Sequence, residues 1–75
     1  MSRLPAITPR EMLTALRRAG FIAVRVKGSH HFLRHAGDPS RTTVIALHAG
    51  DLPPGTLRDI LKQARLSRDE FLALL

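Results

Sequence analysis

The chain contains no cysteine, no tryptophan and no tyrosine, and its only aromatic residues are three phenylalanines. The absence of cysteine excludes disulfide bonds, thiolate metal sites and cysteine nucleophiles. It also suits a reducing compartment, so a cytoplasmic protein is expected. With so few aromatic side chains, the sequence predicts no stacking platform of the kind used by proteins that bind single-stranded nucleic acids.

Long apolar runs are also missing. No stretch approaches the ~20 residues that a membrane-spanning helix needs, and residues 1–6 lack the apolar segment of a signal peptide. The length of 75 residues predicts a single domain over residues 1–75. A domain of this size buries only roughly 60% of its unfolded surface, so a partner protein could add much to its stability.

The net charge of +6 is concentrated in the first half of the sequence. Residues 1–35 carry seven arginine or lysine residues and one glutamate, whereas residues 36–75 carry five cationic and five acidic residues. A positive field of this kind suits a polyanion, with nucleic acid first and an acidic protein second. A solvated basic surface without a partner is the alternative.

Capping patterns and apolar periodicity predict the helices. The run Thr8-Pro9-Arg10-Glu11 predicts a helix start with Thr8 as N-cap, and Gly20 predicts the end of that helix. An apolar stripe at helical spacing predicts a second helix. Its members are Leu57, Ile60, Leu61 and Ala64. A second capping box at Ser67-Arg68-Asp69-Glu70 predicts a short third helix.

Between the first two helices the period changes to two, which predicts three strands. In the first strand, from Phe21, residues 22, 24 and 26 are expected on one face and residues 23, 25 and 27 on the other, so that the strand is half-buried. Residues 30–35 and 42–48 predict the second and third strands. Phe32 and Leu33 are both apolar and leave the orientation of the second strand open. Three antiparallel strands with both helices on one face make a two-layer α+β fold.

A tight turn joins the first two strands. Gly28 can supply the positive φ that a two-residue hairpin turn needs. The turn places His30 at the start of a strand, where its side chain can reach solvent and a substrate. Because an unperturbed histidine exchanges its proton near neutral pH, His30 is the candidate for acid–base chemistry.

Three runs of this sequence resemble the HicA toxins of bacterial toxin–antitoxin pairs. They are Val26–Phe32, Thr42–Val44 and His48–Ala64. The resemblance extends from about Met12 to Leu75, and its most specific parts are the Gly-Ser-His step at residues 28–30 and the Gly-Thr-Leu-Arg helix start at residues 55–58. The chain departs from the family at Ala46, where proline is frequent, and at Arg65, where glycine is usual.

The resemblance implies a fold like that of double-stranded-RNA-binding domains, in the order α-β-β-β-α. It also implies cleavage of mRNA without a metal or other cofactor, and neutralisation by a cognate HicB-type antitoxin. In the family, the histidine of the Gly-Ser-His step carries the activity. The resemblance therefore implies that His30 is the catalytic residue of this chain, as general base or general acid. Supporting roles in catalysis or RNA binding are predicted for Lys27, Gly28, Ser29, Arg25, Arg17 and Arg18.

Because tyrosine and cysteine are absent, the second proton transfer is left to His31, His48, a lysine or water. The sequence assigns no individual role to His31, His35 or His48. His31 follows His30 on a strand, so its side chain points to the opposite face. His31 and His35 share a face but lie ~13 Å apart along the strand. Two ligands of one zinc must lie only a few Å apart. A metal site is therefore not predicted.

The alternative to a ribonuclease is a non-catalytic module of the same fold that binds RNA or docks on a protein. Such a module would have no need of the Gly-Ser-His step. A typical double-strand binder also carries a lysine cluster at the start of its last helix, whereas residues 54–58 here hold a single cation, Arg58. A DNA-binding role is weaker still, because no recognition-helix pattern is present.

Overall fold

Two capping boxes start helices where the sequence predicts them. In α1 (Pro9–Arg18), the Glu11 backbone N–H donates to the Thr8 hydroxyl and the Thr8 N–H donates to the Glu11 carboxylate. In α3 (Arg68–Leu72), Ser67 and Glu70 make the same reciprocal pair. These bonds satisfy amides that the first helical turn leaves without partners. Both predicted starts are confirmed.

The second helix, α2 (Pro54–Ala64), begins without a side-chain cap and ends in a left-handed residue. Arg65 takes φ 56° and ψ 41°, and its N–H donates to the carbonyls of the last helical turn. Glycine adopts this conformation without the steric cost that a Cβ brings. The departure from the family pattern at Arg65 thus falls on a position whose backbone favours glycine.

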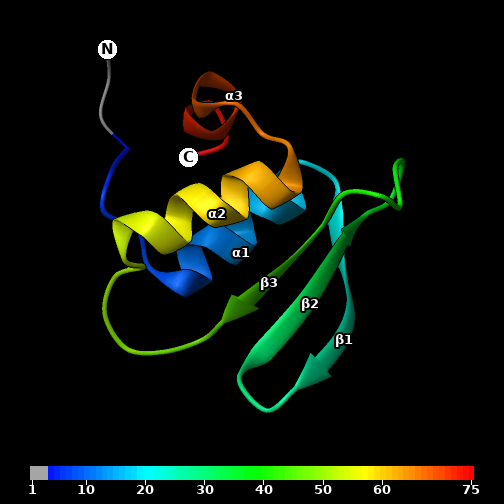
Figure 1. The fold of residues 1–75 in the computed structure, drawn as a ribbon, viewed down its shortest axis with the longest axis horizontal. Helices are drawn as coiled ribbons and strands as arrows, with labels where there is room; N and C mark the ends of the chain where they lie inside the picture. The colour runs from blue at the N-terminus through cyan, green and yellow to red at the C-terminus, as the bar shows by residue number, and fades with distance from the viewer. Residues whose placement is uncertain (1–3) are drawn as a thin grey trace.

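The sheet contains β1 (Phe21–Lys27), β2 (His30–His35) and β3 (Thr42–Ala46), all antiparallel in the order β1-β2-β3. Figure 1 shows α1 and α2 side by side on one face of this sheet, with α3 on the far side of the helices. The predicted α+β fold is therefore confirmed over residues 4–75, which are the residues that the structure, a computed structural model, describes. The predicted end of the third strand at His48 is wrong, since pairing with β2 stops at Ala46.

The predicted facing of β1 is also wrong. The register between β1 and β2 shifts between Ala23 and Arg25, so Val24 is the extra residue of a bulge. Across this bulge the alternation changes phase, and Ile22 shares a face with Arg25 and Lys27. Of the seven residues in β1, only the first, Phe21, is buried. β1 is an edge strand, and the helices cover only its beginning.

The core lies between the sheet and the helices. Leu33 of β2 and Ile45 of β3 are 1% and 0% exposed, and they meet side chains from all three helices in one cluster. The buried Thr43 hydroxyl donates to the Gln63 side-chain oxygen at 2.7 Å, so this polar group is satisfied. Ile7 is also buried, and its carbonyl accepts the Leu52 N–H.

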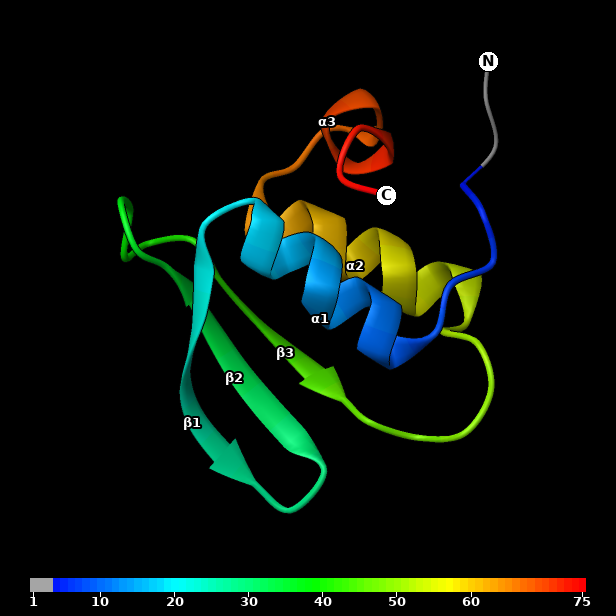
Figure 2. The same cartoon turned by 180° about the vertical axis from the view of Figure 1, so that it is seen from behind.

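The hairpin of β1 and β2 extends beyond the helical layer. Figures 1 and 2 show its tip well away from α1 and α2. The sheet face opposite the helices is uncovered along its whole length, and we call it the open face. None of the helices in residues 4–75 has both the length and the apolar character required to cross a membrane.

Replacing Arg65 by glycine should stabilise the protein. A side chain in the left-handed region costs about 1 kcal/mol relative to glycine, whereas the exposed ion pair that the substitution removes, 3.7 Å between Arg65 and Asp38, contributes little. We expect Arg65→Gly to raise the free energy of unfolding by about 0.5–1 kcal/mol in urea denaturation. Arg65→Ala, which lacks the same ion pair and keeps a Cβ, is the control, and equal stability of the two variants would contradict this explanation.

Stability should fall as the protein is acidified. The Thr8 backbone N–H and hydroxyl lower the pKa of Glu11 from 4.5, the Ser67 pair does the same for Glu70, and hydrogen bonds from Ser40 lower the pKa of Asp38 from 3.8. A carboxyl group whose pKa is lower in the folded state stabilises the fold above its unfolded pKa, and this contribution disappears as the pH drops through the folded pKa.

The urea midpoint should therefore fall between pH 5 and pH 3. The double variant Glu11→Gln/Glu70→Gln, which keeps an acceptor at both caps, should show a smaller fall. An unchanged pH dependence in that variant would show that the capping carboxylates are not its source.

Candidate active site

The turn between β1 and β2 brings Lys27 and His30 together. Gly28 takes φ 59° and Ser29 does not have a positive φ, as in a type II′ turn with glycine at its first central position. Lys27 and His30 are the cross-strand pair that closes this turn. The Ser29 carbonyl accepts the Leu47 N–H at 2.8 Å, which ties the turn to the chain after β3. The predicted conformation of Gly28 is confirmed.

The strand register arranges the open face in rows that run across the sheet. The row at the tip is Lys27–His30–Ala46, the next is Arg25–Phe32–Val44, and the third is Ile22–Arg34–Thr42. Side chains within a row stand about 5 Å apart at Cβ, and rows follow one another by about 7 Å along a strand. Each row therefore presents one cation on a surface that the helices do not cover.

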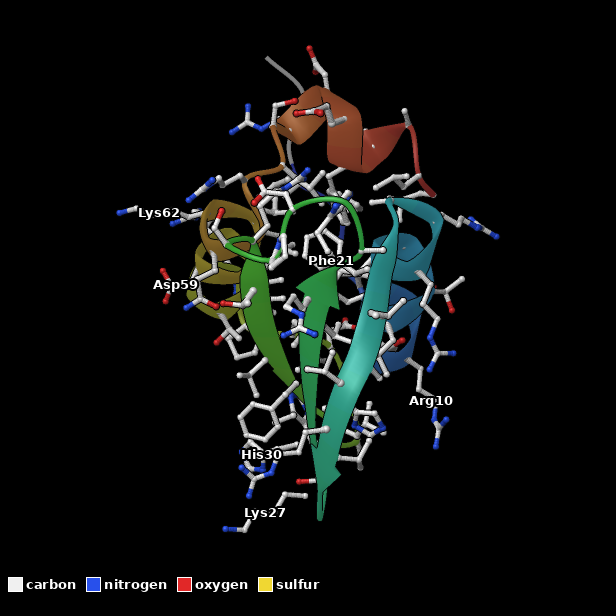
Figure 3. The ribbon with its side chains drawn as sticks, turned by 90° about the vertical axis from the view of Figure 1, so that its right-hand side faces the viewer. Arg10, Phe21, Lys27, His30, Asp59 and Lys62 are labelled. Carbon is white, nitrogen blue, oxygen red and sulfur yellow. The ribbon has the colours of Figure 1, made fainter. Side chains whose placement is uncertain are left out.

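The His30 imidazole is open to solvent. Its side chain is exposed, and no hydrogen bond to it is present among residues 4–75. Figure 3 shows His30 and Lys27 at the same end of the sheet, away from the Lys62 end of α2. A substrate could thus reach both ring nitrogens, and the ring would take its orientation from that substrate.

The hairpin that carries His30 is basic and has no acidic residue. Between Glu11 and Asp38 the sequence holds no acidic residue. Asp38 follows the far end of β2 and is engaged by Ser40 at 2.6 Å and by Arg65. An anionic group at the hairpin would consequently meet cations and no carboxylate of the hairpin itself.

His31 and His35 lie away from His30, as predicted for His31. It pairs with Val26 and Ile45 on the helix side of the sheet. His35 is held in place, because its Nδ1 accepts the Gly37 N–H and its Nε2 lies 3.0 Å from the Ala19 carbonyl. The Nδ1 contact assigns the ring proton to Nε2. His48 lies just beyond β3, with Nδ1 3.0 Å from the Ala49 carbonyl.

Arg17 and Arg18 do not join this site. They close α1, next to the start of β1, and the strand then runs about 20 Å to Lys27. The Arg18 guanidinium donates to the Leu74 carbonyl at 2.7 Å and so anchors the C-terminal segment. The structure places Gly28, Ser29, Lys27 and Arg25 around His30, and the two helix arginines at the opposite end of the molecule.

Sequence reasoning missed Phe32. It lies on the open face one row from His30, and the Arg25 guanidinium carbon is 5.6 Å from the centre of its ring. The signal was the alternation that starts at His30, which puts residues 30, 32 and 34 on one face. The neighbouring apolar Leu33 hid this signal, because either residue could have faced the core.

The described residues hold no group of three or more His, Cys, Asp or Glu side chains able to bind a metal ion. The site therefore consists of one histidine, neighbouring cations and a hydroxyl. Such a set can move a proton and stabilise negative charge on a bound anion.

Comparison with protein families assigns the chain. A model of the HicA toxin of bacterial toxin–antitoxin systems matches residues 9–66, which is more than half of the chain. The chain belongs to the HicA toxin family. The match includes the whole sheet and both helices that cover it, whereas α3 lies outside it. No curated protein matched the sequence. As a HicA toxin, the protein has a cognate antitoxin as its partner.

The two histidines at the ends of β2 should differ in their effect on stability. His35→Ala removes two hydrogen bonds and an edge-on contact with the Phe21 ring, and we expect it to cost about 2 kcal/mol of unfolding free energy. His30→Ala removes no such contact and should change stability by less than about 0.5 kcal/mol. Urea denaturation measures both. A large destabilisation by His30→Ala would mean that this residue has a structural role.

Proposed function

We propose that this HicA toxin is a metal-independent endoribonuclease that cleaves mRNA with His30 and is neutralised by a HicB-type antitoxin. The observation that carries the proposal is the row Lys27–His30, which presents an imidazole and an ammonium side by side on an exposed, carboxylate-free hairpin. Family membership supports a toxin, and the chemistry of the row supports RNA as its target.

RNA supplies its own nucleophile. The 2′-oxygen attacks the adjacent phosphorus, the bond from phosphorus to the 5′-oxygen breaks, and a 2′,3′-cyclic phosphate and a free 5′-hydroxyl result. A base must take the proton of the 2′-hydroxyl, and an acid must give a proton to the departing 5′-oxygen. No bond to a metal is required at either step.

His30 performs one of these proton transfers, because an imidazole exchanges protons at neutral pH and this one is accessible. Lys27 stabilises the negative charge that grows on the phosphoryl oxygens, and the Ser29 hydroxyl can donate a hydrogen bond to the same group. Arg25, one row further, holds the neighbouring phosphate. The second proton transfer falls to Lys27, His48 or water, since His31 faces the other side of the sheet.

Arg17 and Arg18 have a different place in this proposal. At about 20 Å from the hairpin they cannot act on the same phosphate. Arg17 is exposed and can bind a more distant part of a long RNA, whereas the Arg18 guanidinium already donates a hydrogen bond to the Leu74 carbonyl.

Long single-stranded RNA in excess EDTA tests the proposal. The parent protein should cleave it, and His30→Ala should lose at least a hundredfold in rate, in line with the usual contribution of an acid–base group. The matched control is His31→Ala, the next residue on the same strand but on the opposite face, which should cleave at a rate close to the parent. His48→Ala tests whether that residue supplies the second proton transfer.

Two outcomes would overturn the proposal. Equal cleavage by parent and His30→Ala would exclude His30 as the catalytic group. Binding of RNA by the parent without any cleavage would instead support the non-catalytic module.

A further inference from the structure

The middle row of the open face has a flat apolar surface beside the candidate catalytic histidine. Phe32 is half-buried, and its cross-strand neighbour Val44 is 39% exposed. Val24, pushed out of register by the bulge, is 45% exposed. These three side chains line a shallow hollow that continues past Thr42 to Gln63 of α2. Together they offer an apolar contact area beside the cations of the open face.

The same row carries a cation in contact with the aromatic ring. The Arg25 guanidinium lies over the Phe32 ring, with 5.6 Å between its central carbon and the ring centre. A planar guanidinium and an aromatic ring are the two kinds of side chain on which proteins stack unpaired bases. Arg25 is exposed, so its head can move to a phosphate when a base takes the ring.

The distance to His30 suits one nucleotide. Phe32 lies two residues from His30 on the same face of β2, about 7 Å along the strand. A base on Phe32 would thus belong to the nucleotide next to the phosphate held between His30 and Lys27. Its position would fix the 2′-hydroxyl relative to the phosphorus, which is what an in-line attack requires.

Charge favours a nucleic acid over a second copy of the chain. The three rows carry Lys27, Arg25 and Arg34 and no carboxylate, so two such faces would repel each other. A single-stranded RNA supplies both groups that this surface lacks, phosphates for the cations and a planar ring for Phe32.

We propose that Phe32, with Arg25, Val24 and Val44, forms a stacking site for one unpaired base of the RNA next to the bond that is cleaved. This inference rests on the proposed ribonuclease function and adds a substrate requirement: single-stranded RNA, held through a base as well as through its backbone. Phe32 is a binding residue in this proposal and takes no part in proton transfer.

The test measures RNA binding in the His30→Ala background, in which RNA stays intact. The probe is a fluorescein-labelled single-stranded RNA of mixed sequence, and inorganic polyphosphate serves as a polyanion without bases. Adding Phe32→Ala or Phe32→Leu should weaken RNA binding by between about fivefold and a hundredfold, the usual range for loss of one stacked base. Both should leave polyphosphate binding within about twofold, because the phosphate contacts are unchanged.

Three further variants separate stacking from other effects. Phe32→Tyr keeps the ring and should keep the RNA affinity. Lys27→Gln should weaken both probes and reduce the salt dependence of binding, whereas the Phe32 variants should leave that salt dependence unchanged. Val26→Ala is the matched control, an exposed apolar residue of the same hairpin on the other face, and should bind RNA like the His30→Ala parent. Phe32→Leu retains apolar packing and so remains informative if Phe32→Ala fails to fold.

The outcomes distinguish this inference from the function on which it rests. The stacking site would be overturned if the Phe32 variants bind RNA as tightly as the His30→Ala parent. If the protein without substitutions still cleaves RNA, the proposed ribonuclease function would remain intact. Equal loss of RNA and polyphosphate binding would show a structural effect and also overturn the stacking site. Unchanged RNA binding with weakened antitoxin binding would assign the surface to the protein partner. A wild-type protein that neither binds nor cleaves RNA would refute the proposed function itself.

Discussion

The burial of Leu33 and Ile45 against the helices determines which way every side chain of β2 points. Because side chains alternate along a strand, placing Leu33 in the core puts His31 and His35 on the helix side. The same constraint leaves His30, Phe32 and Arg34 on the open face. A slip of one residue would turn His30 to the helix side of the sheet and move Leu33 out of the core. The packing of one leucine therefore decides whether the candidate site exists at all.

The hairpin builds on this orientation in two ways. The glycine turn closes with Lys27 beside His30, and the bulge at Val24 brings Ile22 onto the face of Arg25 and Lys27. Because both groups of the first row lie on the face opposite the helices, they remain accessible. The inner face of the sheet supplies the stability, and its open face presents the groups of the proposed active site.

The two ends of the molecule have separate roles. At the end away from the hairpin turn, Arg41 donates to the Ala64 carbonyl and lies over the Phe21 ring, and Arg18 donates to the Leu74 carbonyl. At the same end, the His35 ring links the end of α1 at Ala19 to Gly37 in the loop after β2. These contacts use cations and a histidine that composition alone would have assigned to nucleic-acid binding. Net charge predicts a polyanion, but it does not tell which cations remain free to bind one.

From the sequence alone came the helix caps, the order of elements and the glycine turn, because capping boxes, turn residues and periodicity are local patterns. The choice of His30 as the catalytic candidate depended on the resemblance of the Gly-Ser-His step to the HicA toxins. What only the tertiary structure decided was the facing of the strands. The bulge in β1 reversed its alternation, and the choice between Phe32 and Leu33 depended on packing against helices distant in the sequence. Local patterns cannot contain that information, since a strand acquires an inside and an outside only when another layer covers it.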